Sequence, residues 1–309
     1  MRIDPIRHRH WRGPGLSGHS LPDSTTIHQG GTMVRILQSA GLDRTGTARP
    51  LDGRVAIVTG STSGIGLAIA NTLAEQGALI VINGLGDEAE IERLCRELSD
   101  RHQTPVRYDD ADLSQAGAVM DLVDRSARAF GPVEILVNNA GIQYVSPIEE
   151  FPPEKWDAIL AINLSAVFHA TRCVLPDMRR RGWGRIINVA SAHGLIGSPF
   201  KSAYVAAKHG VIGLTKVTAL EMAEAGITCN AVCPGYVWTP LVEHQVRAQA
   251  VAHGISEDEV VRKVLLAEQP NKRFATAEEI AGTVAFLCSP AAASITGASI
   301  SVDGGWTAH

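Results

Sequence analysis

The stretch VAIVTGSTSGIGLAIANTLAEQG (55–77) joins a short β-branched apolar run to a glycine-rich turn and then to a helical apolar pattern. The run VAIVT (55–59) predicts a buried strand, and the residues after the turn have the apolar spacing of a helix. The turn carries Gly60, Gly64 and Gly66 in the pattern G-x-x-x-G-x-G. Missing side chains permit a tight turn and let backbone N–H groups approach a pyrophosphate at the helix N-terminus. Between a clear strand and a clear helix, we interpret this turn as a phosphate-binding loop rather than an ordinary connection.

The alternation of strand and helix continues toward the C-terminus. Further strands are predicted at ALIVIN (78–83), VRYDDADL (106–113), VEILVNNAG (133–141), RIINVAS (185–191) and ITCNAVCPG (227–235). Short apolar strands that alternate with helices predict βαβ units and a parallel sheet covered on both faces. Since no repeat or linker interrupts residues 51–309, we expect one α/β domain with a doubly wound parallel sheet.

Residues 1–50 have a different composition from the rest of the chain. They hold seven arginines, no lysine and three acids, mixed with Gly, Pro, Ser and His and without a sustained apolar period. We therefore expect a disordered extension, for which Met33 offers one possible later start. An organelle presequence and a metal-binding histidine tract are the alternatives. Prolines and glycines interrupt every candidate helix, and the histidines are scattered.

The overall composition limits the class of protein. With 45% apolar and 19% charged residues, the 309-residue chain can bury a large core. Its apolar runs fall short of the roughly eighteen uncharged residues of a membrane span, and no secretory signal is predicted. A net charge of −4 gives no electrostatic footprint for nucleic acid. We expect a cytoplasmic protein with a small-molecule substrate and neither a nucleic-acid nor a membrane partner.

The five cysteines do not form a C-x-x-C pair or a zinc-ligand spacing with histidines. They are Cys95, Cys173, Cys229, Cys233 and Cys288. We expect buried thiols in a reducing compartment, and no metal site.

The stretch SAHGLIGSPFKSAYVAAKHG (191–210) carries the residues that predict chemistry. Tyr204 and Lys208 are four apart, so they share one face of a helix. An ammonium beside a phenol favours the phenolate and lowers the phenol pKa from about 10, and an oxidised nicotinamide nearby would act in the same direction. Tyr204 could then take a proton from a secondary alcohol. Ser191, at a predicted strand end, can donate to the substrate oxygen. Each residue alone suits a structural role, such as a half-buried aromatic, a snorkelling lysine or a strand-end cap; together they favour catalysis.

The charge around the glycine-rich turn predicts which dinucleotide binds. A 2′-phosphate on the adenine ribose needs an arginine or lysine in the turn or just after the second strand. Residues 61–63 and 83–92 contain no cation and several acids, so NAD is favoured over NADP. The second strand ends in Asn83-Gly84 rather than in an aspartate that could hold the ribose diol, so a backbone or water-mediated contact must serve. Asp87 is as well suited to begin the next helix.

Six short segments resemble sequence motifs of one known family. They are TGSTSGIG (59–66), NNAG (138–141), INLSA (162–166), YVAAK (204–208), CPGYVWTP (233–240) and SVDGGW (301–306). On these segments, residues 51–309 are identified as a member of the short-chain dehydrogenase/reductase family. The resemblance implies a Rossmann-type fold and a homotetramer. It also implies the catalytic residues Asn163, Ser191, Tyr204 and Lys208, in which Asn163 would hold a water that links Lys208 to solvent.

The resemblance also implies the two sets of binding residues. The expected cofactor contacts are Gly60, Ser61, Thr62, Gly64, Ile65, Gly66, Leu85, Asp112, Leu113, Asn139, Ala140, Gly141, Tyr204, Lys208, Pro234, Gly235, Val237 and Thr239. The expected substrate contacts are Gln143, Ser191, His193, Lys201, Tyr204, Gln245 and Trp306.

This substrate set suits a short 3-hydroxy acid, because a cation with several neutral donors suits a carboxylate. The implied reaction is the NAD-dependent, reversible oxidation of D-3-hydroxybutyrate to acetoacetate. A solvated surface lysine is the alternative for Lys201, and a polar helix position for Gln245. Another reductase of the same fold, such as a 3-oxoacyl-carrier-protein reductase or a sugar dehydrogenase, is the alternative activity. A dinucleotide-binding protein without catalysis is the third hypothesis.

Residues 236–275 interrupt the strand and helix alternation with helical spacing and many charges. We expect a small helical lid over the substrate, and an oligomer contact is the alternative.

Overall fold

The centre of the structure is a parallel sheet of seven strands in the order β3-β2-β1-β4-β5-β6-β7. The computed structural model describes residues 49–239, 242–243, 246–247, 250 and 254–308. The strands are β1 (Val55–Val58), β2 (Leu79–Asn83), β3 (Val106–Asp109), β4 (Ile135–Asn138), β5 (Gly184–Val189), β6 (Ile227–Pro234) and β7 (Ser299–Val302). The strand order reverses between β1 and β4, and α/β sheets bind ligands at such a switch point. The predicted doubly wound fold is confirmed.

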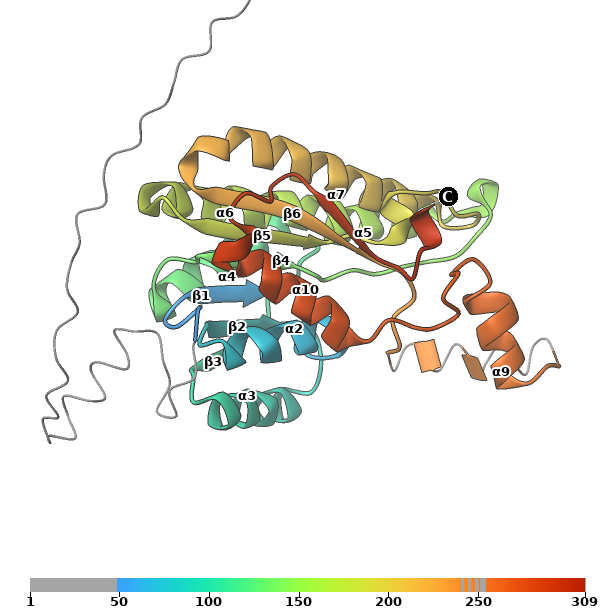
Figure 1. Cartoon of the computed structure of the whole chain (residues 1–309), viewed down its shortest axis with the longest axis horizontal. Helices are drawn as coiled ribbons and strands as arrows, with labels where there is room; N and C mark the ends of the chain where they lie inside the picture. Colours follow the sequence, from blue (N-terminus) through green and yellow to red (C-terminus); the bar gives the residue numbers. More distant parts are fainter. Residues whose placement is uncertain (1–48, 240–241, 244–245, 248–249, 251–253, 309) are drawn as a thin grey trace, which may run out of the picture.

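Helices connect the strands and cover both faces of the sheet (Figure 1). The main ones are α2 (Gly64–Glu75), α3 (Glu88–His102), α4 (Ala116–Phe130), α5 (Pro153–Leu160), α6 (Ala166–Arg181), α7 (Ser202–Glu221), α9 (Glu257–Val260) and α10 (Ala277–Cys288). Two π-helical turns, η2 (Ala161–Ser165) and η5 (Val261–Leu265), continue α5 and α9. The short 3₁₀ turns are η1 (Ile148–Glu150), η3 (Ala192–Gly194), η4 (Ala223–Ala225), η6 (Pro290–Ala292) and η7 (Trp306–Ala308).

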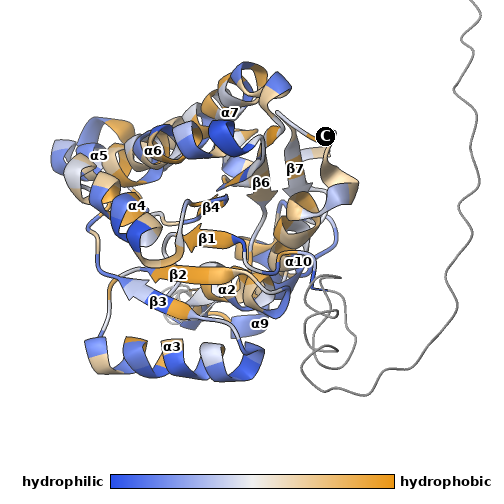
Figure 2. Ribbon diagram, turned by 90° about the vertical axis from the view of Figure 1, so that its left-hand side faces the viewer, coloured by the Kyte–Doolittle hydropathy of each residue, from blue (hydrophilic) through white to orange (hydrophobic). Residues whose placement is uncertain are grey.

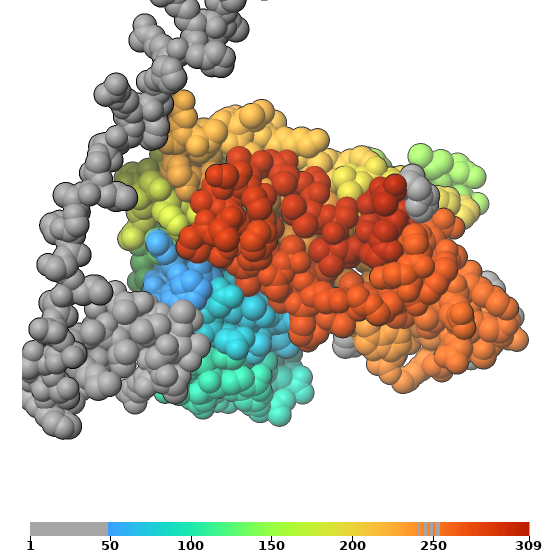
Figure 3. Space-filling view, viewed as in Figure 1, coloured from blue at the N-terminus to red at the C-terminus, as the bar shows by residue number. Residues whose placement is uncertain are grey.

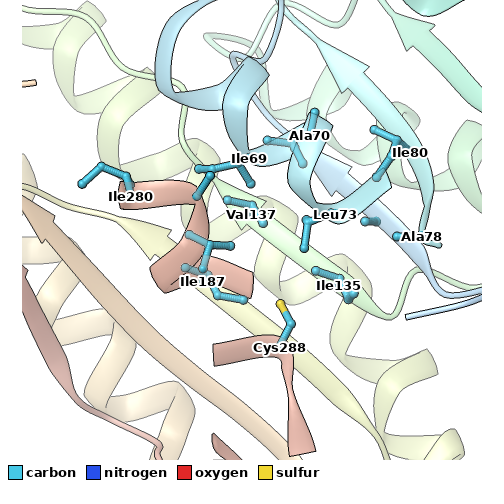
Figure 4. Packing of buried hydrophobic residues seen from close by; sticks show 14 of the residues in the cluster. Ile69, Ala70, Leu73, Ala78, Ile80, Ile135, Val137, Ile187, Ile280 and Cys288 are labelled. Atoms are coloured by element: carbon cyan, nitrogen blue, oxygen red, sulfur yellow. The ribbon is translucent and has the colours of Figure 1, made fainter. Parts of the chain in front are cut away.

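The core lies in two layers because successive strand residues point to opposite faces of the sheet. On one face, Ile80 and Ile135 pack against Ile69 of α2 and Ile280 of α10 (Figure 4). On the other face, strand residues such as Leu136 pack against α4 and α6. Figure 2 shows the resulting order of layers, with α2 and α10 on one side of the sheet and α4, α6 and α7 on the other. Both faces are apolar, which explains why the central strands are near-continuous apolar runs.

β7 is an edge strand that we did not predict from the sequence. It pairs with β6 in parallel, with Ala231 opposite Ser299 and Val232 opposite Ile300. None of its four residues is fully buried, and its sequence SISV alternates polar and apolar residues. A short edge strand lacks the apolar run by which the central strands were recognised.

Two further predictions need correction or detail. The continuous helical run Pro153–Arg181 is long and apolar enough by length and composition to span a membrane, although charged residues interrupt it. Its buried residues pack against α4 and the sheet, as in the core helix of a globular domain.

All five cysteines are free thiols, but Cys173 is only partly buried.

The predicted lid at 236–275 is described in part, and the orange segment with α9 projects from the body of the domain (Figure 3). Its apolar side chains form a small cluster of their own, which includes Val246, Val260 and Leu265. The two ends of the segment are joined, because the Trp238 N–H donates to the Ala275 carbonyl at 3.1 Å. Closure of this segment over a substrate stays a prediction.

Candidate active site

The glycine-rich turn between β1 and α2 leaves no room for side chains at two of its glycines. Gly60 has a positive φ of 61°, and a Cβ added there would lie 2.8 Å from the Ala140 Cα. A Cβ at Gly66 would lie 2.2 Å from the Gly60 carbonyl oxygen. Ser63 precedes α2 without capping it through its side chain. The helix N-terminus therefore presents backbone N–H groups free of a side-chain cap, which fits the pyrophosphate of a dinucleotide.

Asn139 holds this turn to the end of β4. Its side-chain amide donates to the carbonyl oxygens of Thr59 and Gly60, both at 2.9 Å. In return, the Thr59 hydroxyl accepts from the backbone N–H groups of Asn139 at 3.0 Å and Ala140 at 3.1 Å. The expected cofactor contacts from the two segments therefore form one rigid cradle. Thr239 reaches the same place, since its Cγ2 is 3.7 Å from where a Cβ of Gly64 would lie.

β2 ends in the buried Asn83, at the position where the sequence lacks an aspartate that could bind the ribose. Asn83 turns inward, and its side chain donates to the carbonyl oxygens of Asp109 at 3.1 Å and Ala111 at 3.0 Å. The neighbouring Leu85 is 82% exposed. Asp112 is exposed, and hydrogen bonds from Ser114 lower the pKa of its carboxyl group. This rim therefore presents an apolar side chain and a carboxylate, neither of which attracts a 2′-phosphate.

The first turns of α7 bring Tyr204 and Lys208 to the carboxyl end of β5. Lys208 is 4% exposed, and its ammonium donates to the Val189 carbonyl at 2.7 Å. The same nitrogen lies 5.7 Å from the centre of the Tyr204 ring. Ser191 follows β5, and its hydroxyl accepts from the His193 N–H at 3.1 Å. The three predicted catalytic residues of this segment thus lie together.

The protein by itself raises the pKa of Tyr204, which corrects the part of our expectation that rested on Lys208. Burial of the phenol raises this pKa, and a hydrogen bond with the Ser191 hydroxyl opposes the increase. The Lys208 ammonium, which donates to the Val189 carbonyl, does not outweigh the burial. Burial also lowers the pKa of Lys208 to about 8. The structure by itself therefore holds Tyr204 as the neutral phenol.

Asn163 lies in the π-helical turn η2 and is fully buried. Its side-chain oxygen accepts from the Ile142 N–H at 2.9 Å, and its side-chain nitrogen donates to the Ile142 carbonyl at 2.9 Å. π-Helical turns inside α-helices occur frequently at functional sites. Asn163 therefore fixes the segment that follows β4, and the water that we assigned to it stays a prediction.

Several of the expected substrate contacts converge beside Tyr204. The His193 ring lies 6.2 Å from the Tyr204 ring and 5.0 Å from the Trp306 ring, measured between centroids. Burial and then the charge of Lys201 lower the pKa of His193 to about 4, so this imidazole is neutral at pH 7. Lys201 is half-buried, and burial lowers its pKa as well. The cluster therefore combines one ammonium, one neutral imidazole and aromatic rings.

For two further expected substrate residues, the structure gives no contact with this cluster or does not describe the residue. Gln143 is exposed on the segment that Asn163 holds. Gln245 lies outside the described residues. In contrast, Tyr236 belongs to the cluster although we did not select it, because its ring stacks on Trp306 at 5.4 Å and lies 5.9 Å from the Lys201 ammonium. Its position directly after the Pro234-Gly235 turn of β6 was the available signal.

Comparison with known proteins covers most of the chain. A family model described as enoyl-(acyl carrier protein) reductase matches residues 60–307. A D-beta-hydroxybutyrate dehydrogenase of Rhizobium meliloti (strain 1021) is 53% identical over 256 residues, which is 83% of this chain and 99% of that protein. A D-beta-hydroxybutyrate dehydrogenase of Cupriavidus necator is 52% identical over 263 residues, which is 84% of this chain and 100% of that protein. A 3-oxoacyl-[acyl-carrier-protein] reductase of Staphylococcus epidermidis is 37% identical over 250 residues, which is 81% of this chain and 97% of that protein.

Proposed function

The chain belongs to the short-chain dehydrogenase/reductase family, and from this we propose that it catalyses the NAD-dependent, reversible oxidation of D-3-hydroxybutyrate to acetoacetate. The names of two relatives that are more than half identical to this chain support the substrate. The observation that carries the proposal is the half-buried Lys201 beside His193 and Tyr204, because a partly desolvated ammonium next to a general base suits a short hydroxy acid.

The cofactor would be held by the turn at 59–66, by the uncapped N-terminus of α2 and by the segment that Asn139 fixes. When bound, the oxidised nicotinamide supplies the acceptor for the hydride that leaves C3 of the substrate. It also brings a positive charge, which favours the phenolate of Tyr204 and opposes the effect of burial. NAD is the proposed dinucleotide because residues 61–63 and 83–92 carry no cation for a 2′-phosphate.

The protein side chains would manage the proton and the carboxylate. Tyr204 takes the hydroxyl proton during oxidation and returns it during reduction. Ser191 donates a hydrogen bond to the same substrate oxygen, and the buried Lys208 ammonium favours the ionised phenol once the second positive charge is present. Because Tyr204 must first lose its proton, oxidation is expected to accelerate as the pH rises, whereas reduction is expected to slow.

An assay with a panel of substrates tests this function. We expect NADH formation from D-3-hydroxybutyrate, much less from the L-enantiomer, and a large preference for NAD over NADP in kcat/KM. Activity on 3-hydroxyacyl thioesters with no activity on the free acids would instead support a 3-oxoacyl-carrier-protein reductase. Binding of NAD without turnover of any substrate would support a dinucleotide-binding protein without catalysis.

We also infer a cytoplasmic homotetramer. Exposed apolar side chains on α6 and α7, among them Phe168, Val217 and Leu220, support a face that another subunit covers. Free thiols at all five cysteines support a reducing compartment. Sedimentation of the purified protein tests the tetramer, and a stable monomer would contradict it.

A further inference from the structure

Three chain segments meet beneath the substrate cluster with almost no space between them. They are the residues after β6, the end of the predicted lid, and the residues after β7. A Cβ added to Gly235 would lie 2.6 Å from the side-chain oxygen of Gln269 and 2.9 Å from the Asp303 Cα. A Cβ added to Gly304 would lie 2.3 Å from the Asn271 side chain. A shift of any one of these segments must therefore move the others.

Gln269 is the polar side chain that connects these segments. It is 1% exposed. Its side-chain oxygen accepts from the Tyr236 N–H at 3.1 Å, and its side-chain nitrogen donates to the Asn271 side chain at 3.2 Å and to the Arg273 carbonyl. A buried amide is costly unless it is hydrogen-bonded, and this one is bonded at both ends. Gln269 thus joins the start of the lid segment to its end.

The residues that Gln269 holds are those that close the substrate cluster. The Tyr236 ring stacks on Trp306, with centroids 5.4 Å apart and planes 10° apart. Asp303 holds the turn that carries Trp306, because its carboxylate accepts from the N–H groups of Gly305 at 3.0 Å and Thr307 at 2.9 Å. The position of the Tyr236 backbone therefore determines where the Tyr236 and Trp306 rings lie beside His193 and Lys201.

We propose that Gln269 is a positioning residue for substrate binding, which acts by hydrogen-bonding the Tyr236 backbone and thereby fixing the Tyr236 and Trp306 rings. The proposal rests on the proposed function, because it assigns these rings to the pocket of a hydroxy acid. Among the described residues, the hydrogen bonds of the Gln269 side chain go to Tyr236, Asn271 and Arg273, so the proton transfer at Tyr204 does not depend on it. Gln269 also lies against Gly235, an expected cofactor contact, so the affinity for NAD is measured beside the KM of the hydroxy acid.

The test is Gln269→Leu, which keeps a similar size but removes both the acceptor and the donor. The buried Tyr236 N–H then loses its partner, and the Tyr236 and Trp306 rings lose their fixed position. We expect the KM for D-3-hydroxybutyrate to rise by about tenfold, with kcat changed by less than about twofold, because loss of uniform binding raises KM alone. Asn271→Ala, a milder change at an exposed residue, should shift KM in the same direction and decides the matter if Gln269→Leu does not fold.

Asn230→Leu is the matched control. Asn230 is also 1% exposed and lies on β6. Its side chain likewise joins two backbone groups, accepting from Ala298 at 3.1 Å and donating to Ile295 at 2.7 Å. We expect this variant to lose stability but to keep its KM. An equal rise in KM for Asn230→Leu, or an unchanged KM for Gln269→Leu, would overturn the proposal.

Amide hydrogen exchange provides a measurement that needs no substrate. Exchange of the Tyr236 amide should accelerate in Gln269→Leu and stay slow in the control, because the bond to the Gln269 oxygen protects it in the wild type. If exchange accelerates while no hydroxy acid is oxidised by the wild type, the proposed function fails and the structural role of Gln269 stands. If exchange is unchanged, the role of Gln269 fails whatever the substrate is.

Discussion

The candidate site has two halves, one for the proposed cofactor and one for the proposed substrate, and they consist of different chemical groups. The cofactor half is a turn of glycines and backbone N–H groups, held by one short segment around Asn139. The substrate half consists of side chains, among them His193, Lys201 and Trp306, that come from segments far apart in the sequence. A cradle of backbone groups recognises the pyrophosphate that all dinucleotides share. The side chains of the other half must then determine which alcohol reacts, so changes in the two halves should have separable effects.

The largest effect is expected where the two halves meet, at Tyr204. Tyr204→Phe keeps the ring but removes the hydroxyl that transfers the proton. Turnover should fall by about 10² to 10⁴, as is typical when a general acid or base is lost. The affinity for NAD, measured by calorimetry, should stay the same because the cradle is intact. Near-normal turnover in this variant would show that another group carries the proton.

The next effect concerns acid stability and belongs to the substrate half. The pKa of His193 is lowered to about 4 by burial and by Lys201, so the unfolded chain binds this proton more readily than the folded one. Stability should therefore fall as the pH drops from about 6.5 to 4, by roughly 3 kcal/mol for this group. Denaturant unfolding of wild type and His193→Gln at pH 7 and pH 4 measures the difference. The same loss of stability in both proteins would refute the assignment.

Lys201→Ala should isolate recognition of the carboxylate. Loss of a charge-assisted hydrogen bond in a partly shielded site corresponds to a fall of about 10- to 10²-fold in kcat/KM for 3-hydroxybutyrate. The loss should largely vanish for an uncharged ester of the same acid. Lys155→Ala, at an exposed lysine, is the control and should leave both substrates unaffected. An equal loss on acid and ester would mean that Lys201 supports the start of α7 instead of binding the substrate.

Gly66→Ala should damage the cofactor half alone. The added Cβ would lie 2.2 Å from the Gly60 carbonyl, so the turn must shift. We expect a stability loss of about 1 to 3 kcal/mol, as for overpacked sites, together with weaker NAD binding. Gly213→Ala is the control, because nothing lies within 4 Å of its Cβ position. Wild-type affinity for NAD in Gly66→Ala would show that the turn does not hold the pyrophosphate.

The smallest effect is expected for the N-terminal extension, which belongs to neither half. Its composition does not support a packed core, so removal of residues 1–48 should leave stability and kcat/KM unchanged. Thermal unfolding and an activity assay compare the two forms. A truncated chain that aggregates or loses activity would assign a role to this segment, which lies outside the described residues.

Sequence patterns show the glycine-rich turn more directly than the side-chain cluster around His193. The turn at 59–66 is one contiguous segment. It requires residues without side chains at fixed positions, and glycines at these positions are visible in the sequence. The proposed catalytic pair, Tyr204 and Lys208, also lies on one helix, four residues apart. Tyr236 and Gln269 escaped prediction because their roles depend on partners that are distant in the chain, namely Trp306 for the ring and the Tyr236 backbone for the amide. β7 was not predicted for a related reason, because this short edge strand is recognised by its pairing with β6 and not by its own sequence.

The sequence by itself determined the α/β class, the parallel sheet, the glycine-rich turn and the membership of a dehydrogenase family, because local periodicity and contiguous motifs encode all of these. Only the tertiary structure decided the direction in which the protein itself shifts the pKa of Tyr204. The spacing of Tyr204 and Lys208 predicted a lowered phenol pKa, yet burial raises it and the ammonium is engaged by the Val189 carbonyl. Desolvation depends on everything packed around a group, so no pattern along the chain could have shown its sign at Tyr204.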